Sequence, residues 1–523
     1  MKFVSDPSIP TKIQKMRQRV RWRDPVVLHQ GIDQTQLVLD DGKDDNPEFS
    51  FLVIGDSGSG AHRGHNPQRQ IAEGMLQHRD ESRFILHTGD VIYLVGSSEY
   101  YLKNFIEPYR EFLVGGDRPE KIPFNQMVFN LPFLPVPGNH DYYDLPIVLG
   151  MLAKSFSPLS RLLNSKIDFD VGWHGSKQGK AYAQAFLDYL IDLPTDQALL
   201  QHLDRHYTAT CDQGRCLRYQ PKQFTRLPNR YYSFRSGGID FFALDSNTFN
   251  APSPLPNDEA GRAYRQLLEQ RRSEVVAQKE AILQQFSKPR LVQSFPVDHL
   301  DDLRTKLEQL EEVERDIDQQ LEMRLPPEID VEQLTWLKQR LIESWHNSEV
   351  RGRVLFFHHP PYVTEATKWH QAQTLAVRQR LRQVFTEVAI AVPDRAGRPL
   401  VDLVLNGHAH CLEHLRTVDT AMADANINWI VCGGSGYSLR RQRVEGIEIR
   451  ETLLAEGKVD SLYVAQSQLY IGRTGQGSEK RRPYSFIRID VQDGCPPRFV
   501  VRPYIAERYH GKWHQQELPS FKI

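Results

Sequence analysis

Residues 49–58 read FSFLVIGDSG, an apolar run that ends in a glycine-rich turn carrying Asp56. The same form returns in FILHTGDVIY over residues 84–93, where Asp90 and Tyr93 follow the apolar run. Short apolar runs bounded by turn residues are typical of buried strands. We therefore predict buried strands that deliver polar side chains at their carboxyl ends.

Further segments repeat this pattern, and helical stretches separate several of them. The segments are LPFLPVPGNHDYY (131–143), GGIDFFALDSN (237–247), GRVLFFHHPPY (352–362), VDLVLNGHAH (401–410) and NWIVCGGSG (428–436). Strands that alternate with helices indicate an α/β layered fold whose site lies at the carboxyl ends of the strands.

The size and composition of the chain are those of a large globular protein. It has 523 residues, of which 40% are hydrophobic and 25% charged, enough for a buried core. Lys and Arg number 65 against 66 Asp and Glu, so a net charge of -1 gives no global attraction for nucleic acid or an anionic membrane. No apolar run is long enough for a membrane span, and the N-terminal stretch lacks an apolar signal region. The odd count of 5 cysteines argues against a disulfide framework, so we expect a cytoplasmic protein.

Composition divides the chain into a core and the segments that depart from it. Residues 1–47 are first basic and then acidic and predict an N-terminal arm, and residues 506–523 predict a C-terminal tail. The core domain is predicted over residues 48–505. It carries a cap or loop insertion at 142–230 and a second insertion at 257–323.

The insertion at 257–323 has a helical pattern. Leu and Ile recur close to a and d heptad spacing from Leu300 to Leu321, and the positions between them are mostly charged. Pro289 and Pro296 separate this stretch from an earlier helical one. We expect a helical hairpin that either covers one edge of the core or serves as an arm for a protein partner or an oligomer.

The polar residues at the predicted strand ends are all of metal-binding or proton-transferring types. They are Asp56 in GDSG, Asp90 and Tyr93 in GDVIY, Asn139, His140 and Asp141 in GNHD, His358 in HHPPY, and His408 and His410 in GHAH. Carboxylate, amide oxygen and imidazole together suit Mn, Fe, Zn or a mixed pair. Each motif alone is an ordinary turn or a core histidine. Their joint occurrence after apolar strands predicts a site for two metal ions.

These motifs resemble those of the calcineurin-like metallophosphoesterase superfamily, whose pattern is D-x-H/G, GD, GNHD/E, H and GHxH. The resemblance covers about residues 49–141, 231–250 and 335–440. It implies a four-layer αββα metallophosphoesterase sandwich, here with a helical hairpin insertion.

One exchange of residues points to a branch of that superfamily. The chain has Asp56-Ser57-Gly58 in place of Asp-x-His, and Tyr93 lies three residues after Asp90. This exchange is similar to that of the purple acid phosphatases, whose tyrosinate holds Fe(III). The pairing is chemically consistent, because hard trivalent iron favours an anionic oxygen over a neutral nitrogen.

The resemblance also implies a ligand layout and a reaction. One ion would be held by Asp56, Tyr93 and His410, the other by Asn139, His358 and His408, with Asp90 as the bridge. The expected cofactors are two metal ions, iron together with zinc, manganese or a second iron. Two such cations lower the pKa of a bound water to give a hydroxide, which attacks phosphorus. His140 would then protonate the leaving alkoxide, with Asp141 orienting its ring.

Functions of different classes use such a site. The leading expectation is a phosphomonoesterase of the purple acid phosphatase type. A phosphodiesterase acting on nucleotides, nucleic acid or phospholipid would use the same centre with a pocket for the second ester. A protein that binds metal without turnover, with the hairpin engaging a partner, is the third possibility. The intact ligand set and the His140–Asp141 pair favour catalysis.

Overall fold

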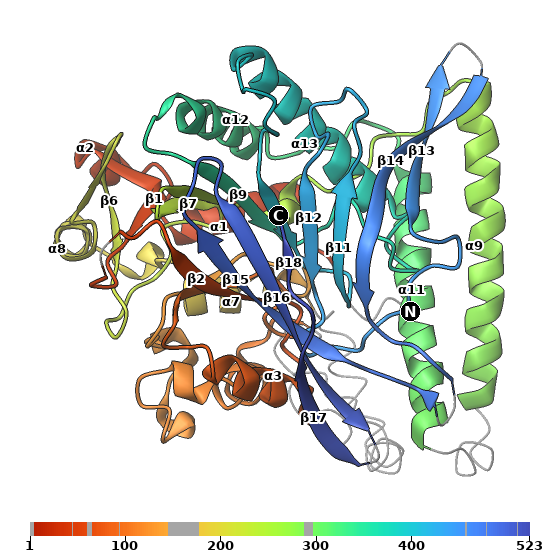
Figure 1. Ribbon diagram of the computed structural model, residues 1–523, viewed down its shortest axis with the longest axis horizontal. Helices are drawn as coiled ribbons and strands as arrows, with labels where there is room; N and C mark the ends of the chain where they lie inside the picture. The colour runs from red at the N-terminus through yellow and green to blue at the C-terminus, as the bar shows by residue number, and fades with distance from the viewer. Residues whose placement is uncertain are drawn as a thin grey trace.

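A computed structural model describes the chain except for residues 1–4, 44, 60–64, 94, 145–176, 287–296, 456–457, 477–478 and 510. Its strands form two large sheets, and helices flank them (Figure 1). The mixed α/β class predicted from the sequence is confirmed.

The larger sheet has 11 strands. Their order is β13 (Glu448–Ala455), β14 (Lys458–Ile471), β11 (Leu412–Thr417), β12 (Asn428–Cys432), β10 (Leu403–Asn406), β9 (Gly352–Phe357), β8 (Ile239–Ala243), β7 (Tyr232–Ser236), β1 (Ile32–Leu39), β6 (Gly214–Tyr219) and β5 (Ala209–Cys211). Strands β8, β9, β10 and β12 run parallel, so their carboxyl ends lie at one edge of the sheet.

The smaller sheet has 7 strands. Their order is β17 (Lys512–Glu517), β16 (Arg498–Tyr509), β15 (Tyr484–Gln492), β2 (Phe49–Ile54), β3 (Ser82–His87) and β4 (Phe133–Pro135), with β18 (Phe521–Lys522) paired to β16. Strands β2, β3 and β4 are parallel and supply the first three polar motifs.

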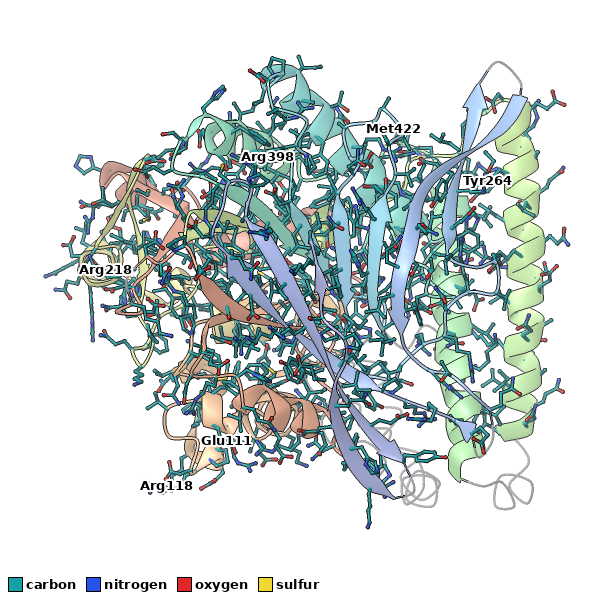
Figure 2. All side chains as sticks on the ribbon, in the orientation of Figure 1. Glu111, Arg118, Arg218, Tyr264, Arg398 and Met422 are labelled. Carbon is teal, nitrogen blue, oxygen red and sulfur yellow. The ribbon has the colours of Figure 1, made fainter. Side chains whose placement is uncertain are left out.

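Helices cover the outer side of each sheet. The main ones are α12 (Val331–His346) and α13 (Ala372–Ala391) on the larger sheet, and α3 (Pro67–Leu76) on the smaller. Residues along β10 alternate between two cores, as the two-residue period of a strand requires. Leu403 and Leu405 pack with Phe51 and Phe84 of the smaller sheet, whereas Val404 packs with the helices. Side chains fill the space between these layers (Figure 2), which form the predicted four-layer αββα sandwich.

The predicted hairpin is present as two long helices, which lie side by side in Figure 1. They are α9 (Glu259–Phe286) and α11 (Val297–Glu322). Arg272 pairs with Asp318 at 2.6 Å, and Lys279 pairs with Glu314 at 2.6 Å. Because the later residue of α9 contacts the earlier residue of α11, the helices are antiparallel. A small apolar core of Val275, Ile282 and Leu310 lies between them.

The segments predicted as an arm and a tail contribute strands to the two sheets. Residues 1–47 include α1 (Ile9–Arg19) and α2 (Pro25–His29), and they end in β1, which lies between β7 and β6. Residues 506–523 finish β16 and form β17 and β18. Polar residues concealed both strands. In β1, Gln34 and Thr35 are buried and hydrogen-bonded, to Val20 at 2.8 Å and Trp336 at 2.9 Å. Strand β17 lies at the edge of its sheet, where few apolar residues are needed.

The predicted cap at 142–230 lies partly outside the described residues. Its described part contains α7 (Lys180–Phe186) and α8 (Asp196–His206), and it adds β5 and β6 to the larger sheet. Throughout the described part of the chain, no helix combines the length and the apolar character that crossing a bilayer requires.

Candidate metal centre

The loops that follow strands of both sheets meet between the sheets. Asp56 follows β2, Asp90 follows β3, Asn139 follows β4, His358 follows β9 and His408 follows β10. Since each set of strands is parallel, these loops emerge at the same edge of the sandwich. The polar residues predicted at strand ends are therefore brought together.

One group of side chains joins Asp56, Tyr93 and His410. The phenol oxygen of Tyr93 lies 2.7 Å from Oδ1 of Asp56 and 3.2 Å from Nε2 of His410. Nε2 of His410 lies 3.6 Å from the same carboxylate oxygen. All three side chains are buried. A carboxylate, a phenol and an imidazole thus face a common point.

A second group joins Asn139, His358 and His408. Nε2 of His358 lies 2.9 Å from Oδ1 of Asn139 and 3.2 Å from Nδ1 of His408. These side chains are also buried. Two imidazole nitrogens and an amide oxygen therefore converge beside the first group.

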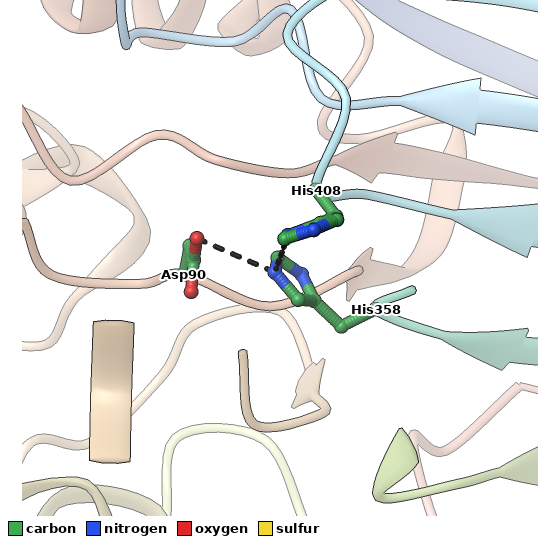
Figure 3. A group of neighbouring side chains, drawn as sticks. All are labelled: Asp90, His358 and His408. Carbon is green, nitrogen blue, oxygen red and sulfur yellow. Dashed lines mark hydrogen bonds and ion pairs between the residues drawn. The ribbon is translucent and has the colours of Figure 1, made fainter. Parts of the chain in front are cut away.

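Asp90 lies between the two groups. Its Oδ2 is 2.9 Å from the phenol oxygen of Tyr93 and 3.3 Å from Nε2 of His358. Its Oδ1 accepts a hydrogen bond of 2.8 Å from the backbone N–H of His140. Figure 3 shows Asp90, His358 and His408 facing one another, and one ligand atom from each lies within 4.8 Å of the others. Asp90 therefore contacts a member of each group.

Backbone carbonyls orient two of the histidines. Nδ1 of His358 donates to the carbonyl of Thr88 at 2.9 Å, and Nδ1 of His410 donates to the carbonyl of Ser438 at 3.1 Å. A carbonyl only accepts, so each Nδ1 carries a proton and each Nε2 is directed at the carboxylates. Metal-binding histidines are commonly fixed by such a bond from their other nitrogen.

Burial of several acidic groups close together shifts the pKa values of the side chains in this site. Burial raises the pKa of Asp56 to about 8, and the nearby Asp90 adds to the rise. Burial alone would lower the pKa of His358, but Asp90 outweighs it and the pKa rises to about 9. Burial, Asp56 and Asp90 raise the pKa of Tyr93 well above its usual value. Buried carboxylates need compensating positive charge, so the site favours protons or cations.

The backbone is strained at three of the predicted ligands. Asp56, Asp90 and His408 have φ values of 53°, 55° and 67°, in the left-handed region. Such conformations cost on the order of 1–3 kcal/mol each and cluster at functional sites. Position 138 of GNHD requires glycine for a different reason, because a Cβ there would lie 2.1 Å from Oδ1 of Asp90. The strain and the close approach both serve the placement of these side chains.

The residues present fit hard or borderline metal ions. Their donor atoms are carboxylate, phenol and amide oxygens and imidazole nitrogens, which suit iron, zinc and manganese. They form two groups that share Asp90. Among the described His, Cys, Asp and Glu residues, Asp90, His358 and His408 have ligand atoms close enough together to hold an ion. The structure therefore contains a candidate metal site.

Asp141 is hydrogen-bonded to the backbone of two loops. Its carboxylate accepts hydrogen bonds from the backbone N–H groups of Gly138 at 2.9 Å, Val91 at 3.1 Å and Ile92 at 3.3 Å. These bonds tie GNHD to the loop after β3. Buried polar groups in folded proteins form hydrogen bonds, and here backbone N–H groups provide them for the Asp141 carboxylate.

His140 lies at the edge of the site. Its ring centroid is 4.3 Å from that of Tyr93 and 4.9 Å from that of Tyr143. It is partly exposed, whereas His358, His359, His408 and His410 are buried. His359 contacts Ser246 at 2.8 Å and Asn250 at 3.1 Å. His140 is thus the site imidazole that an incoming molecule can reach.

The structure adds residues that the sequence did not single out. The ring of Tyr437 stacks on Tyr93 with centroids 4.0 Å apart. Nζ of Lys368 lies 3.0 Å from Nε2 of His408. Burial lowers the pKa of His410 well below its usual value, and the nearby charge of Arg440 lowers it further. Tyr437 follows the glycine-rich turn after β12, a signal that could have found it. Lys368 and Arg440 carry no motif.

Comparisons with known proteins give distant likenesses only. No family model and no curated protein matches the sequence. A purple acid phosphatase from seeds of yellow lupin (Lupinus luteus) is 12% identical, with a TM-score of 0.42 over 92% of this chain and 54% of that one. This chain therefore spans about half the length of the lupin protein.

Two other solved structures are similar at the same level. GAP50, the anchor in the inner membrane complex of Plasmodium, is 11% identical, with a TM-score of 0.37 over 90% of this chain and 89% of that one. PhoD is 11% identical, with a TM-score of 0.38 over 91% of this chain and 69% of that one. Likenesses this distant carry no argument about function, which rests on the geometry of the site.

Proposed function

We propose that the chain is a phosphoesterase that uses two metal ions, with phosphate monoesters as its substrates. The observation that carries this proposal is the position of Asp90 between two groups of donors. Oδ2 of Asp90 lies 2.9 Å from Tyr93 in one group and 3.3 Å from His358 in the other. A shared carboxylate between two donor sets is what a two-metal hydrolase requires.

Each group would hold one ion. The first comprises Asp56, Tyr93 and His410, the second comprises Asn139, His358 and His408, and Asp90 belongs to both. Ions bound there would neutralise phosphate oxygens and lower the pKa of a water molecule. Iron is proposed for the first group because Tyr93 supplies a phenol oxygen, with zinc, manganese or a second iron in the other.

The chain itself supplies a proton donor and positive charge. The partly exposed ring of His140 lies beside Tyr93, where it can protonate the leaving oxygen of an ester. The buried guanidinium of Arg440 lies near His410, whose pKa it lowers further below the value that burial alone would give. Extra positive charge favours the dianionic terminal phosphate of a monoester over the single charge of a diester.

The test compares turnover of an aryl phosphate monoester with that of the matching diester. The protein is reconstituted with iron, zinc or manganese, and Asp90→Asn serves as an isosteric control that removes the shared carboxylate. We expect preference for the monoester, and loss of turnover in the variant. Preference for the diester would contradict the monoester assignment, and undiminished turnover in Asp90→Asn would contradict the site.

A further inference from the structure

Strands β5 and β6 form an antiparallel pair that carries two cysteines. The register pairs Ala209 with Cys216, and Cys211 with Gly214. Side chains two residues apart on a strand, and those directly opposite each other, point to the same face of a sheet. Cys211 and Cys216 are therefore diagonal neighbours on one face. Gly214 lies opposite Cys211 and two residues before Cys216, so its position puts no side chain beside the two sulfur atoms.

The two thiols already contact each other. The S–H group of Cys216 donates a hydrogen bond to the sulfur of Cys211. Both residues are free cysteines, and Cys211 is partly exposed whereas Cys216 is fully buried. Two cysteines can be bridged without backbone movement only when their side chains approach closely and point toward each other. The hydrogen bond places this pair in that arrangement.

The turn between the two cysteines is anchored to α12 and β1. The guanidinium of Arg340 donates to the amide oxygen of Gln213 at 3.3 Å, and the Gln213 amide donates to Glu343 at 3.1 Å. Arg340 also forms an ion pair with Asp33 of β1. Contacts outside the strand pair thus hold the turn, so the fold sets the positions of the two thiols.

The surroundings of Cys211 favour its thiolate. The hydrogen bond from Cys216 has the largest effect and lowers the pKa of Cys211 to about 7, helped by the backbone N–H of Gln213 and the charge of Arg340, although burial opposes the shift. The same hydrogen bond and burial raise the pKa of Cys216. Because the thiolate is the nucleophile in thiol chemistry, Cys211 is the reactive, accessible member of the pair.

We propose that Cys211 and Cys216 are a modification site, at which a low-molecular-weight disulfide such as glutathione disulfide reversibly forms an intramolecular disulfide. The Cys211 thiolate attacks one sulfur of the oxidant, forms a mixed disulfide and releases a thiolate that takes a proton from solvent. The sulfur of Cys216 then attacks that of Cys211, and the second small thiol leaves with the Cys216 proton. Two cysteines are oxidised, and one small disulfide is reduced to two thiols.

The test treats the full chain with glutathione disulfide and maps the product by mass spectrometry. The parent protein carries Cys495→Ser, which removes a further exposed thiol. Trypsin cuts after Arg205, Arg215 and Arg218, so Cys211 lies in peptide 206–215 and Cys216 in peptide 216–218. The proposed disulfide therefore links two peptides that are otherwise separate.

Two variants of the parent separate the contributions of the thiols. Cys211→Ala removes the exposed thiol, and Cys216→Ala removes the buried donor. Cys411 and Cys432 are buried in every variant and serve as internal controls that should stay unmodified. Thermal unfolding of each variant checks that the fold is retained. The linked peptides are measured in the parent, so the proposal stays testable if a variant does not fold.

We expect the parent to lose two hydrogens and yield the linked peptides, and dithiothreitol to reverse both changes. Cys216→Ala should retain one glutathione on Cys211, because no second thiol displaces it. The pH at which alkylation of Cys211 reaches half its maximal rate should rise by about one unit or more in Cys216→Ala, since the donor to the thiolate is lost. Cys211→Ala should not react, because Cys216 is buried.

Two results would overturn the proposal. One is the absence of linked peptides in the parent under excess glutathione disulfide. The other is a glutathione adduct on Cys216 in Cys211→Ala that forms as fast as the adduct on Cys211 in Cys216→Ala. Neither readout involves metal binding or turnover, so both are independent of the proposed function.

Discussion

His140 and Asp141, which are adjacent in GNHD, differ in what they contact. The carboxylate of Asp141 is buried and accepts three backbone N–H groups, and burial together with Asp90 raises its pKa to about 7. The ring of His140 is partly exposed and packs on Tyr93. Asp141 thus joins the two loops, whereas His140 is the residue that we propose as the proton donor to the substrate.

Substitutions at these residues should separate stability from turnover. Asp141→Asn turns an amide NH₂ toward backbone donors and should lower the free energy of unfolding by roughly 2–3 kcal/mol. His140→Ala should lower kcat for an aryl phosphate about a hundredfold or more and cost less stability. Denaturant unfolding and steady-state kinetics measure both. The reverse pattern would contradict the two assignments.

The ligand role of Tyr93 has a spectroscopic test. The phenol is buried beside two carboxylates, so it ionises only when a cation compensates its charge. Iron-loaded protein should show a visible phenolate-to-iron band that Tyr93→Phe abolishes. Tyr437→Phe is the control, because it keeps the ring that stacks on Tyr93 at 4.0 Å and removes only a hydroxyl. A band that survives in Tyr93→Phe would exclude the phenol as an iron ligand.

At the scale of elements, β11 carries a buried acid outside the metal centre. Glu413 is fully buried and accepts the backbone N–H of Thr364 at 3.0 Å. Burial raises its pKa to about 7, although bonds from Thr364 oppose the rise. Because the folded-state pKa lies above the unfolded value, the contribution of Glu413 to stability is fully present below about pH 4.5 and is lost as the pH rises through 7.

Replacing this acid should therefore change how stability depends on pH. Relative to the wild type, Glu413→Gln should gain about 2 kcal/mol of unfolding free energy between about pH 5.5 and pH 8.5. Denaturant unfolding of both proteins at the two pH values measures the difference. A difference that is independent of pH would contradict the raised pKa of Glu413.

The sequence predicted the elements that carry a clear apolar period. Runs such as FSFLVIG and VLFFHH are buried on both faces, so their strands and the polar residues after them were readable. Strands β1 and β17 were not, because half of the residues of β1 and most of those of β17 are polar, and their pairing is set by the rest of the sheet. The hairpin was predicted because its second helix repeats Leu and Ile at regular spacing, after two prolines that separate it from an earlier helical stretch.

The candidate site was predictable only to the extent that its residues lie in motifs. Asp56, Asp90, Asn139, His358 and His408 follow strands, and parallel strands necessarily bring them together. Lys368 and Glu312 lie 56 residues apart in the chain, and only the packing of the hairpin against the core makes them neighbours. Such contacts have no local signal. The hydrogen bonds between Asp141 and the loop after β3 likewise depend on how the two loops pack, which no local pattern records.

At the scale of the whole molecule, each of the two sheets contributes part of the residues of the site. The smaller sheet supplies Asp56, Asp90 and Asn139, and the larger sheet supplies His358 and His408. Each half alone has too few donors for two ions. The phenylalanine-rich core between the sheets therefore fixes the distances across the centre; Phe51 of the smaller sheet packs edge-on against Phe241 of the larger sheet, with ring centroids 5.5 Å apart.

The most direct test is a titration of metal-free protein with manganese, or with iron followed by zinc, that records ions bound per chain and turnover of an aryl phosphate monoester. The two-metal account predicts that turnover appears as the second ion binds and reaches its plateau at two ions per chain. Turnover without added metal, a plateau at one ion, or two bound ions without hydrolysis would contradict it.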